Sequence, residues 1–353
     1  MLRPSALWRT RFSRGVSRPS NHFTNSARST HLDLCRRPSG FSYGAIAEHG
    51  FVAPLDKECR KMKGRLFLKH TGLRKVLFVA CLLLCASCAA PGMPPGTAPP
   101  PGTKYVALGS SFAAGAGIGP LQPGAPERCG RTANNYASLL AEALDLRLVD
   151  ASCGGATTSH VLGSWNELAP QIAEVDAETR LVTITIGGND LNYIGDLFMA
   201  SCMASKRGVE AGAEKPCASP TWPTDEDYTN VQSALEAIAL AVRESAPAAR
   251  IVFVQYVSLV PDRPCDSTAM PAGYAVRTRR IGRRLAEATV RAAEAAQVEV
   301  FPADRLSREH TACAPVPWAK GGTATVGDQP GAPWHPNALG HREIAAALAT
   351  MLR

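Results

Sequence analysis

Short apolar segments alternate with longer segments of helical periodicity from Lys104 to the end of the chain. The apolar segments are rich in β-branched residues, and the first three lead directly into Gly109, Asp150 and Gly187, as buried strands followed by loops commonly do. The predicted strands are Tyr105–Leu108, Arg147–Val149, Leu181–Ile186, Ile251–Val254 and Val298–Phe301.

The segments between the strands have the apolar spacing of amphipathic helices. The predicted helices are Tyr136–Leu144, 227–245, Ile281–Ala296 and Ala338–Leu352, the last capped by Asn337. Strands that alternate with helices of this length favour a mostly parallel five-stranded sheet with helices on both faces, a three-layer α/β/α sandwich. Ligands in such folds bind at the carboxyl ends of the strands.

The N-terminal quarter has a different pattern. Residues 1–61 show no apolar period, and we interpret them as a disordered extension or as a segment upstream of the true translation start. Residues 62–88 have the form of an export signal, because several basic residues precede the apolar run Val76–Leu84, which is too short to cross a bilayer. Residues 89–103 form a Pro/Gly-rich linker, and residues 104–353 form the predicted domain.

The end of the signal resembles a bacterial lipobox, which implies lipidation of Cys88 and a membrane tether. Cys85 occupies a position where the lipobox prefers Leu, so cleavage after Ala89 or Ala90 by the ordinary signal peptidase stays open. Both alternatives predict export, either as a membrane-anchored lipoprotein or as a secreted or periplasmic protein.

The net charge of +8 comes from the N-terminal quarter. Residues 1–88 contain 16 Lys and Arg against 4 Asp and Glu, whereas residues 89–353 contain 22 against 26. The predicted domain is therefore slightly acidic, which argues against a nucleic-acid partner. A composition that is 45% hydrophobic and 19% charged is that of a globular protein rather than a disordered one.

Four short blocks follow or flank the predicted elements. They are Gly109-Ser110-Ser111-Phe112 after the first strand, Cys153-Gly154-Gly155-Ala156 after the second, Gly187-Gly188-Asn189-Asp190 after the third and Trp334-His335-Pro336-Asn337 before the last helix. In these blocks and their order the chain resembles the SGNH (GDSL-type) hydrolases, and the resemblance covers about residues 104–352. It implies a flavodoxin-like sandwich with Ser111 as nucleophile, His335 as general base, and Gly155 and Asn189 in the oxyanion hole.

The residue types suit this chemistry. Acyl transfer needs a nucleophile, a base that takes its proton, and hydrogen-bond donors directed at the developing oxyanion. Ser111 lies just past a strand end, where its own N–H can also serve as a donor. Gly155 allows a close backbone approach, and Asn189 supplies an amide donor. The imidazole of His335 titrates near neutrality, so activity is expected to fall as His335 becomes protonated.

Two positions depart from the family pattern. Ser110 replaces the usual Asp before the nucleophile, which leaves open which serine attacks, and Ser111 is the favoured one by its alignment. Ala332 stands where the family usually has the Asp that orients the histidine. The backbone carbonyl of Ala332 or, alternatively, the carboxylate of Asp328 is expected to accept the proton on Nδ1 of His335.

Six cysteines lie within the predicted domain, and an even number in an exported domain suggests disulfides. The strand order 2-1-3-4-5 of flavodoxin-like sheets places the second strand beside the first and the fifth beside the fourth. Together with the resemblance to disulfide-bonded secreted actinobacterial esterases and lipases, this order favours Cys129–Cys153, Cys202–Cys217 and Cys265–Cys313.

The resulting hypothesis is an exported, monomeric serine esterase or lipase that cleaves small-molecule or lipid esters through an acyl-enzyme, with a Ser–His dyad or triad and no metal or organic cofactor. The alternatives are an acyltransferase or phospholipase that acts on envelope lipids or glycans, and a catalytically silent envelope protein. A zinc site formed by His335 and His341 is not expected, because residues six apart on a helix face different directions. Aromatic side chains near the blocks, Trp334 among them, are expected to pack rather than to line an acyl pocket.

Overall fold

The computed structural model describes residues 97–204, 217, 219–323 and 329–353. The extension, the signal with Cys88, the first part of the linker and Asp328 lie outside these residues, so the expectations attached to them remain predictions.

The central sheet has five strands, all parallel, in the order β2-β1-β3-β4-β5. Each strand overlaps a segment predicted from the sequence. The strands are β1 Lys104–Gly109, β2 Arg147–Asp150, β3 Thr179–Thr185, β4 Arg250–Val254 and β5 Glu299–Phe301. The order and direction of the strands confirm the predicted doubly wound sandwich.

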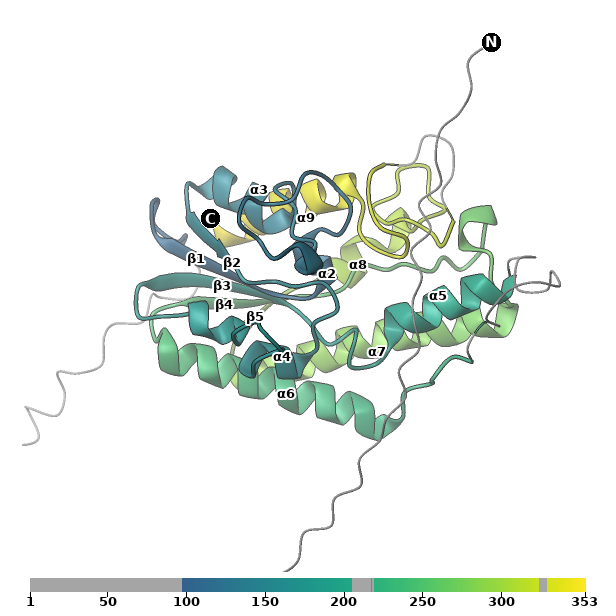
Figure 1. The fold of residues 1–353 in the computed structure, drawn as a ribbon, viewed down its shortest axis with the longest axis horizontal. Coiled ribbons are helices and arrows are strands. Elements are labelled where there is room, and N and C mark those ends of the chain that lie inside the picture. Colours follow the sequence, from purple (N-terminus) through teal and green to yellow (C-terminus); the bar gives the residue numbers. More distant parts are fainter. Residues whose placement is uncertain (1–96, 205–216, 218, 324–328) are drawn as a thin grey trace, which may run out of the picture. The chain divides into compact units, whose positions relative to one another are not determined.

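Helices cover both faces of the sheet (Figure 1). On one face α3 packs against α9, and on the other α6 packs against α7, with α4 and α5 beside them. The helices are α2 Ser111–Ala114, α3 Tyr136–Leu144, α4 Thr158–Leu162, α5 Tyr193–Ala204, α6 Asp225–Ser245, α7 Ala272–Ala296, α8 Ala303–Leu306 and α9 Ala338–Leu352. Short 3₁₀ turns occupy Glu127–Cys129, Gln171–Glu174, Asp266–Thr268 and Arg308–His310.

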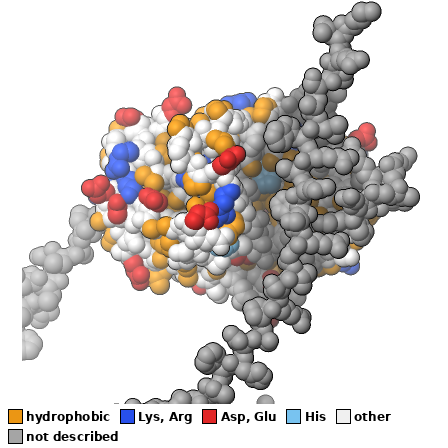
Figure 2. All heavy atoms as spheres, in the orientation of Figure 1, with side chains coloured by type: hydrophobic (Ala, Val, Ile, Leu, Met, Phe, Trp, Pro, Cys, Tyr) orange, Lys and Arg blue, Asp and Glu red, His pale blue; other side chains and the backbone are white. Residues whose placement is uncertain are grey.

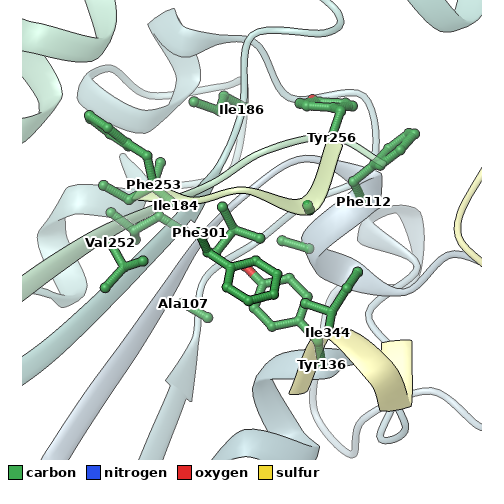
Figure 3. Packing of buried hydrophobic residues seen from close by; sticks show 14 of the residues in the cluster. Ala107, Phe112, Tyr136, Ile184, Ile186, Val252, Phe253, Tyr256, Phe301 and Ile344 are labelled. Carbon is green, nitrogen blue, oxygen red and sulfur yellow. The ribbon is translucent and has the colours of Figure 1, made fainter. Parts of the chain in front are cut away.

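The hydrophobic core lies between the sheet and each helical layer. All six residues of β1 are buried, which agrees with a strand covered on both faces. Figure 3 shows Tyr136 of α3 and Ile344 of α9 close together, and Phe112 and Tyr256 beside one another at the end of the core. The last two residues connect the core to the candidate site.

Two of the longer helices differ from the prediction, and the short helices α2, α4 and α8 were not predicted either. α7 begins at Ala272, nine residues before the predicted start at Ile281, because its first turns bury only small residues such as Ala275 and expose Val276. α5 was not predicted, since the low apolar contrast between its faces gives little helical periodicity. The hydrophobic pattern therefore identified the helices with a clear apolar face and missed those without one.

The described end of the linker lies against the domain. Arg250, the first residue of β4, donates a hydrogen bond from Nη1 to the carbonyl of Thr97 at 2.9 Å and another to the carbonyl of Leu352 at 2.9 Å. The same guanidinium forms an ion pair with Glu299, the first residue of β5, at 2.8 Å. The chain thus enters the domain at the amino ends of the strands.

All three predicted disulfides are present: Cys129–Cys153, Cys202–Cys217 and Cys265–Cys313. The first joins the loops after β1 and β2, and the third joins the loops after β4 and β5. Both of these therefore tie together neighbouring strands at the carboxyl edge of the sheet, as the strand order predicted.

The described surface carries charges of both signs. On the face visible in Figure 2, Lys and Arg side chains are interspersed with Asp and Glu, without an extended basic region. Across the ranges that the structure describes, no helix is long and apolar enough to cross a membrane.

Candidate active site

Ser111 is the first residue of α2 and is separated from the end of β1 by Ser110 alone. Phe112, the next residue, is buried against Tyr256 with ring centroids 4.3 Å apart, whereas Ser111 itself remains partly exposed. The packing of Phe112 fixes the start of the helix, so the Ser111 hydroxyl is held at the carboxyl edge of the sheet.

Ser110 has a structural position. Its side chain is 1% exposed, and its Oγ lies 2.8 Å from the hydroxyl of Tyr256. The same hydroxyl accepts the N–H of Gly188 at 3.1 Å, which leaves the tyrosine proton for Ser110. Burial raises the pKa of Tyr256, so its hydroxyl keeps this proton. Ser110 thereby links the first and third blocks.

His335 contacts Ser111 directly. Its Nε2 lies 2.7 Å from Ser111 Oγ, and its Nδ1 lies 2.7 Å from the carbonyl oxygen of Pro333. A carbonyl can only accept, so Nδ1 carries the proton and Nε2 is free to accept the hydroxyl proton of Ser111. This is the tautomer that a general base for Ser111 requires.

The acceptor for His335 differs from the prediction by one residue. The carbonyl of Ala332 does not accept from the imidazole. It accepts the backbone N–H of His335 at 3.3 Å. Pro333 and Trp334 form the centre of this turn, and Trp334 has a positive φ of 57°. These are features of a type II turn, in which the central carbonyl points away from the closing hydrogen bond. The prediction of the Ala332 carbonyl was therefore wrong, because that carbonyl closes the turn.

The imidazole of His335 is shielded from solvent. Its ring lies 5.0 Å from that of Phe112, and the residue is buried. Burial lowers the pKa of His335 below its ordinary value, and the hydrogen bond to the Pro333 carbonyl opposes that shift in part. Because burial is the larger effect, the imidazole is neutral near pH 7 and can act as a base.

The two predicted oxyanion residues lie on neighbouring loops. Gly155 has φ of +82°, a conformation that strongly favours glycine, and within the described ranges its N–H has no protein acceptor. Asn189 donates from Nδ2 to the carbonyl of Ala156 at 2.8 Å, which uses one of its two amide hydrogens and leaves the second. This bond connects the second block to the third.

Further contacts hold these loops to the nucleophile. Cys153 N–H donates to the carbonyl of Gly109 at 3.0 Å, and Ser110 N–H donates to the carbonyl of Thr185 at 2.9 Å. The carboxylate of Asp190 accepts the N–H of Thr158 at 3.1 Å, at the start of α4. The hydrogen bonds and the Cys129–Cys153 disulfide therefore join the first three blocks into one framework.

His341 belongs to the core. It is buried on α9, and its Nδ1 accepts the backbone N–H of Tyr136 at 3.0 Å. Among the described residues, no group of three or more His, Cys, Asp or Glu side chains is arranged to bind a metal ion.

The sequence interpretation missed two groups at this site. Tyr256 lies two residues after the end of β4, so its place near a strand end was the available signal. For the Pro333 carbonyl the available signal was the proline itself. Pro is common at the second position of type II turns, and Pro333 occupies that position in the turn formed by residues 332–335.

A serine hydroxyl bonded to a buried, correctly protonated histidine at the carboxyl edge of a doubly wound sheet is the arrangement of a serine hydrolase. A sequence model of the GDSL-like Lipase/Acylhydrolase family matches residues 107–343. The chain belongs to this family and is a carboxylic ester hydrolase.

Individual relatives agree with this assignment. "Lipase 2" of Streptomyces coelicolor is 34% identical over 253 residues, which cover 69% of this chain and 84% of the relative. The "Lipase" of Streptomyces rimosus is 30% identical over 161 residues, which cover 44% of this chain and 52% of the relative.

Solved structures show the same fold. The extracellular lipase of Streptomyces rimosus superposes with a TM-score of 0.55 at 23% identity, and the match covers 70% of this chain and 99% of the lipase. Phospholipase A1 from Streptomyces albidoflavus NA297 gives a TM-score of 0.53 at 22% identity, with the same coverage of both chains.

Proposed function

We propose that the protein is an exported serine esterase or lipase that forms an acyl-enzyme on Ser111 with His335 as its general base. The carrying observation is the 2.7 Å contact between Ser111 Oγ and His335 Nε2, with the Pro333 carbonyl on the opposite nitrogen. The Pro333 carbonyl lies at Nδ1, where a triad has its carboxylate, which supports a dyad oriented by the backbone.

In the acylation step Ser111 Oγ attacks the ester carbonyl carbon while its proton passes to Nε2 of His335. The tetrahedral intermediate then collapses, the bond to the alcohol oxygen breaks, and the imidazolium returns the proton to the leaving alkoxide. Nδ1 keeps its proton throughout and stays bonded to the Pro333 carbonyl, which stabilises the imidazolium.

Water releases the acyl group by the reverse sequence. His335 removes a proton from the water as it attacks the acyl carbon, and then donates that proton to Ser111 Oγ as the acid leaves. The negative oxygen of both intermediates is bound by the N–H of Ser111, the N–H of Gly155 and the free amide hydrogen of Asn189. Each such donor typically contributes about 3–4 kcal/mol to the transition state.

Export is supported by the three disulfides, because such bonds persist mainly in oxidising compartments. The structural similarity to an enzyme described as extracellular agrees with it. Processing of the lipobox would place the membrane tether on Cys88. We propose that the active protein is a monomer. Palmitate labelling that is lost in Cys88→Ala tests the tether, and an unlabelled wild-type protein refutes it.

Reaction with a fluorophosphonate probe and turnover of p-nitrophenyl esters of short and long acyl chains test the catalytic assignment. Ser111→Ala is expected to lose labelling and turnover. Ser110→Ala is expected to be labelled still, because it retains Ser111. The matched control is Ser233→Ala, because Ser233 is an exposed serine on α6. Unchanged labelling in Ser111→Ala refutes the nucleophile, and ester cleavage that requires an added alcohol acceptor refutes hydrolysis in favour of transfer.

A further inference from the structure

Trp334 combines two features that rarely occur together. Its side chain is 0% exposed, and its backbone has φ of 57°, where a bulky residue is strained. Such a conformation persists only where the surroundings hold it in place. Trp334 lies between Pro333, whose carbonyl orients the imidazole, and His335 itself, so whatever holds Trp334 also holds the catalytic base.

One side-chain hydrogen bond fixes the indole. Trp334 Nε1 donates to Oγ of Ser201 at 2.9 Å, and Ser201 lies in the last turn of α5, 133 residues before Trp334 and outside the four blocks. A buried indole N–H normally requires an acceptor. Among the described residues, the hydroxyl of Ser201 fills this role for Trp334 Nε1.

The surroundings keep Ser201 and the indole together. Gly322 packs against both groups, and a Cβ at this position would overlap Ser201 Oγ and approach Trp334 Nε1 to 2.8 Å. Cys202, the residue after Ser201, forms the disulfide with Cys217, which fixes the end of α5 covalently. The Ser201–Trp334 contact is therefore closely packed, and a larger side chain at position 322 would disrupt it.

Backbone contacts hold the rest of the turn. The N–H of Trp334 donates to the carbonyl of Gly321 at 3.2 Å, and the N–H of Ala332 donates to the carbonyl of Ala116 at 2.9 Å. Neither bond fixes the orientation of the indole, which the Ser201 hydroxyl does.

We propose that Ser201 is a positioning residue for catalysis: by holding the buried indole of Trp334, it keeps the Pro333 carbonyl directed at Nδ1 of His335. The inference rests on the proposed Ser111–His335 pair. It assigns to α5, outside the four sequence blocks, a role in orienting the general base.

The test compares Ser201→Ala, Trp334→Phe and the double variant by kcat/KM for a soluble p-nitrophenyl ester from pH 4 to 9. Rates are normalised to the sites that a fluorophosphonate titrates, so that unfolded protein does not count. Each single variant is expected to lower kcat about tenfold at the pH plateau, with little change in KM, because the turn loses a buried hydrogen bond. The double variant is expected to match the single variants, since both remove the same bond.

The pH profile separates positioning from general damage. The Pro333 carbonyl raises the pKa of His335 by accepting its Nδ1 proton, so a weakened contact lowers that pKa and moves the acid limb of the profile to lower pH. Three results would each overturn the proposal. They are a lowered plateau with an unmoved acid limb, wild-type activity in Ser201→Ala, and additive losses in the double variant. Ser233→Ala should behave as wild type.

Trp334→Phe removes the indole N–H without touching α5, so it tests the proposal even if Ser201→Ala fails to fold. Failure of the positioning role is distinct from failure of the catalytic assignment. In the first case Ser111→Ala is still inactive while Ser201→Ala has the wild-type profile, and in the second Ser111→Ala retains activity.

Discussion

The imidazole of His341 is buried between α9 and α3 and should make the stability of the protein depend on pH. Its Nδ1 accepts the N–H of Tyr136, whereas its Nε2 is buried without a protein partner among the described residues. Burial, with a smaller contribution from the nearby His335, lowers the pKa of His341 from 6.5 to about 3.

The magnitude follows from proton linkage. Between pH 6.5 and about 3 the unfolded chain binds a proton at residue 341 that the folded protein does not bind, so stability falls as the pH falls. One pH unit is worth about 1.4 kcal/mol, so the loss at pH 5 relative to pH 8 is about 2 kcal/mol from this residue alone. That is a substantial part of a typical unfolding free energy of about 5–15 kcal/mol.

Urea unfolding with intact disulfides, followed from pH 8 to pH 5, measures this effect when wild type is compared with His341→Asn. The asparagine oxygen can still accept the Tyr136 N–H but does not titrate. The difference in unfolding free energy between the two proteins should shift by about 2 kcal/mol across this range, to the disadvantage of wild type at low pH. A constant difference from pH 8 to pH 5 would refute the reasoning.

Two further predictions concern catalysis. Asn189→Ala should lower kcat about 10²–10³-fold with little change in KM, because the amide acts on the oxyanion of the transition state; equal losses in ground-state binding would contradict this. Since burial lowers the pKa of His335, the acid limb of kcat/KM measured against pH should have its midpoint below pH 6.5, the ordinary value for a histidine. A midpoint at or above pH 6.5 would contradict this.

Much of the fold was predictable because the strands are apolar and short. The run Leu181–Ile186 is short and rich in β-branched residues, which favours a buried strand, and the alternation with helices then implied a parallel sheet. The strand order in turn brought Cys129 near Cys153 and Cys265 near Cys313, so topology and the family resemblance together identified the disulfides.

The detail around His335 was not predictable in the same way. Ala332 and Pro333 both have a carbonyl within reach in the sequence, and the choice between them depends on the φ of Trp334. A positive φ is unusual for a tryptophan, and here it is supported by a partner in α5, more than 100 residues away. Local sequence does not contain that contact, whereas the candidate catalytic residues were recognisable from their motifs.

The chain enters the domain at the end opposite the Ser111–His335 pair. Arg250 binds the carbonyl of Thr97 at the amino ends of the strands, whereas Ser111 and His335 lie at the carboxyl edge, across a sheet about 20 Å deep. A lipid anchor on Cys88 would therefore attach at the end of the domain opposite the Ser111–His335 pair. The pair would not have to lie against the anchoring bilayer, so ester substrates could reach it from the surrounding medium.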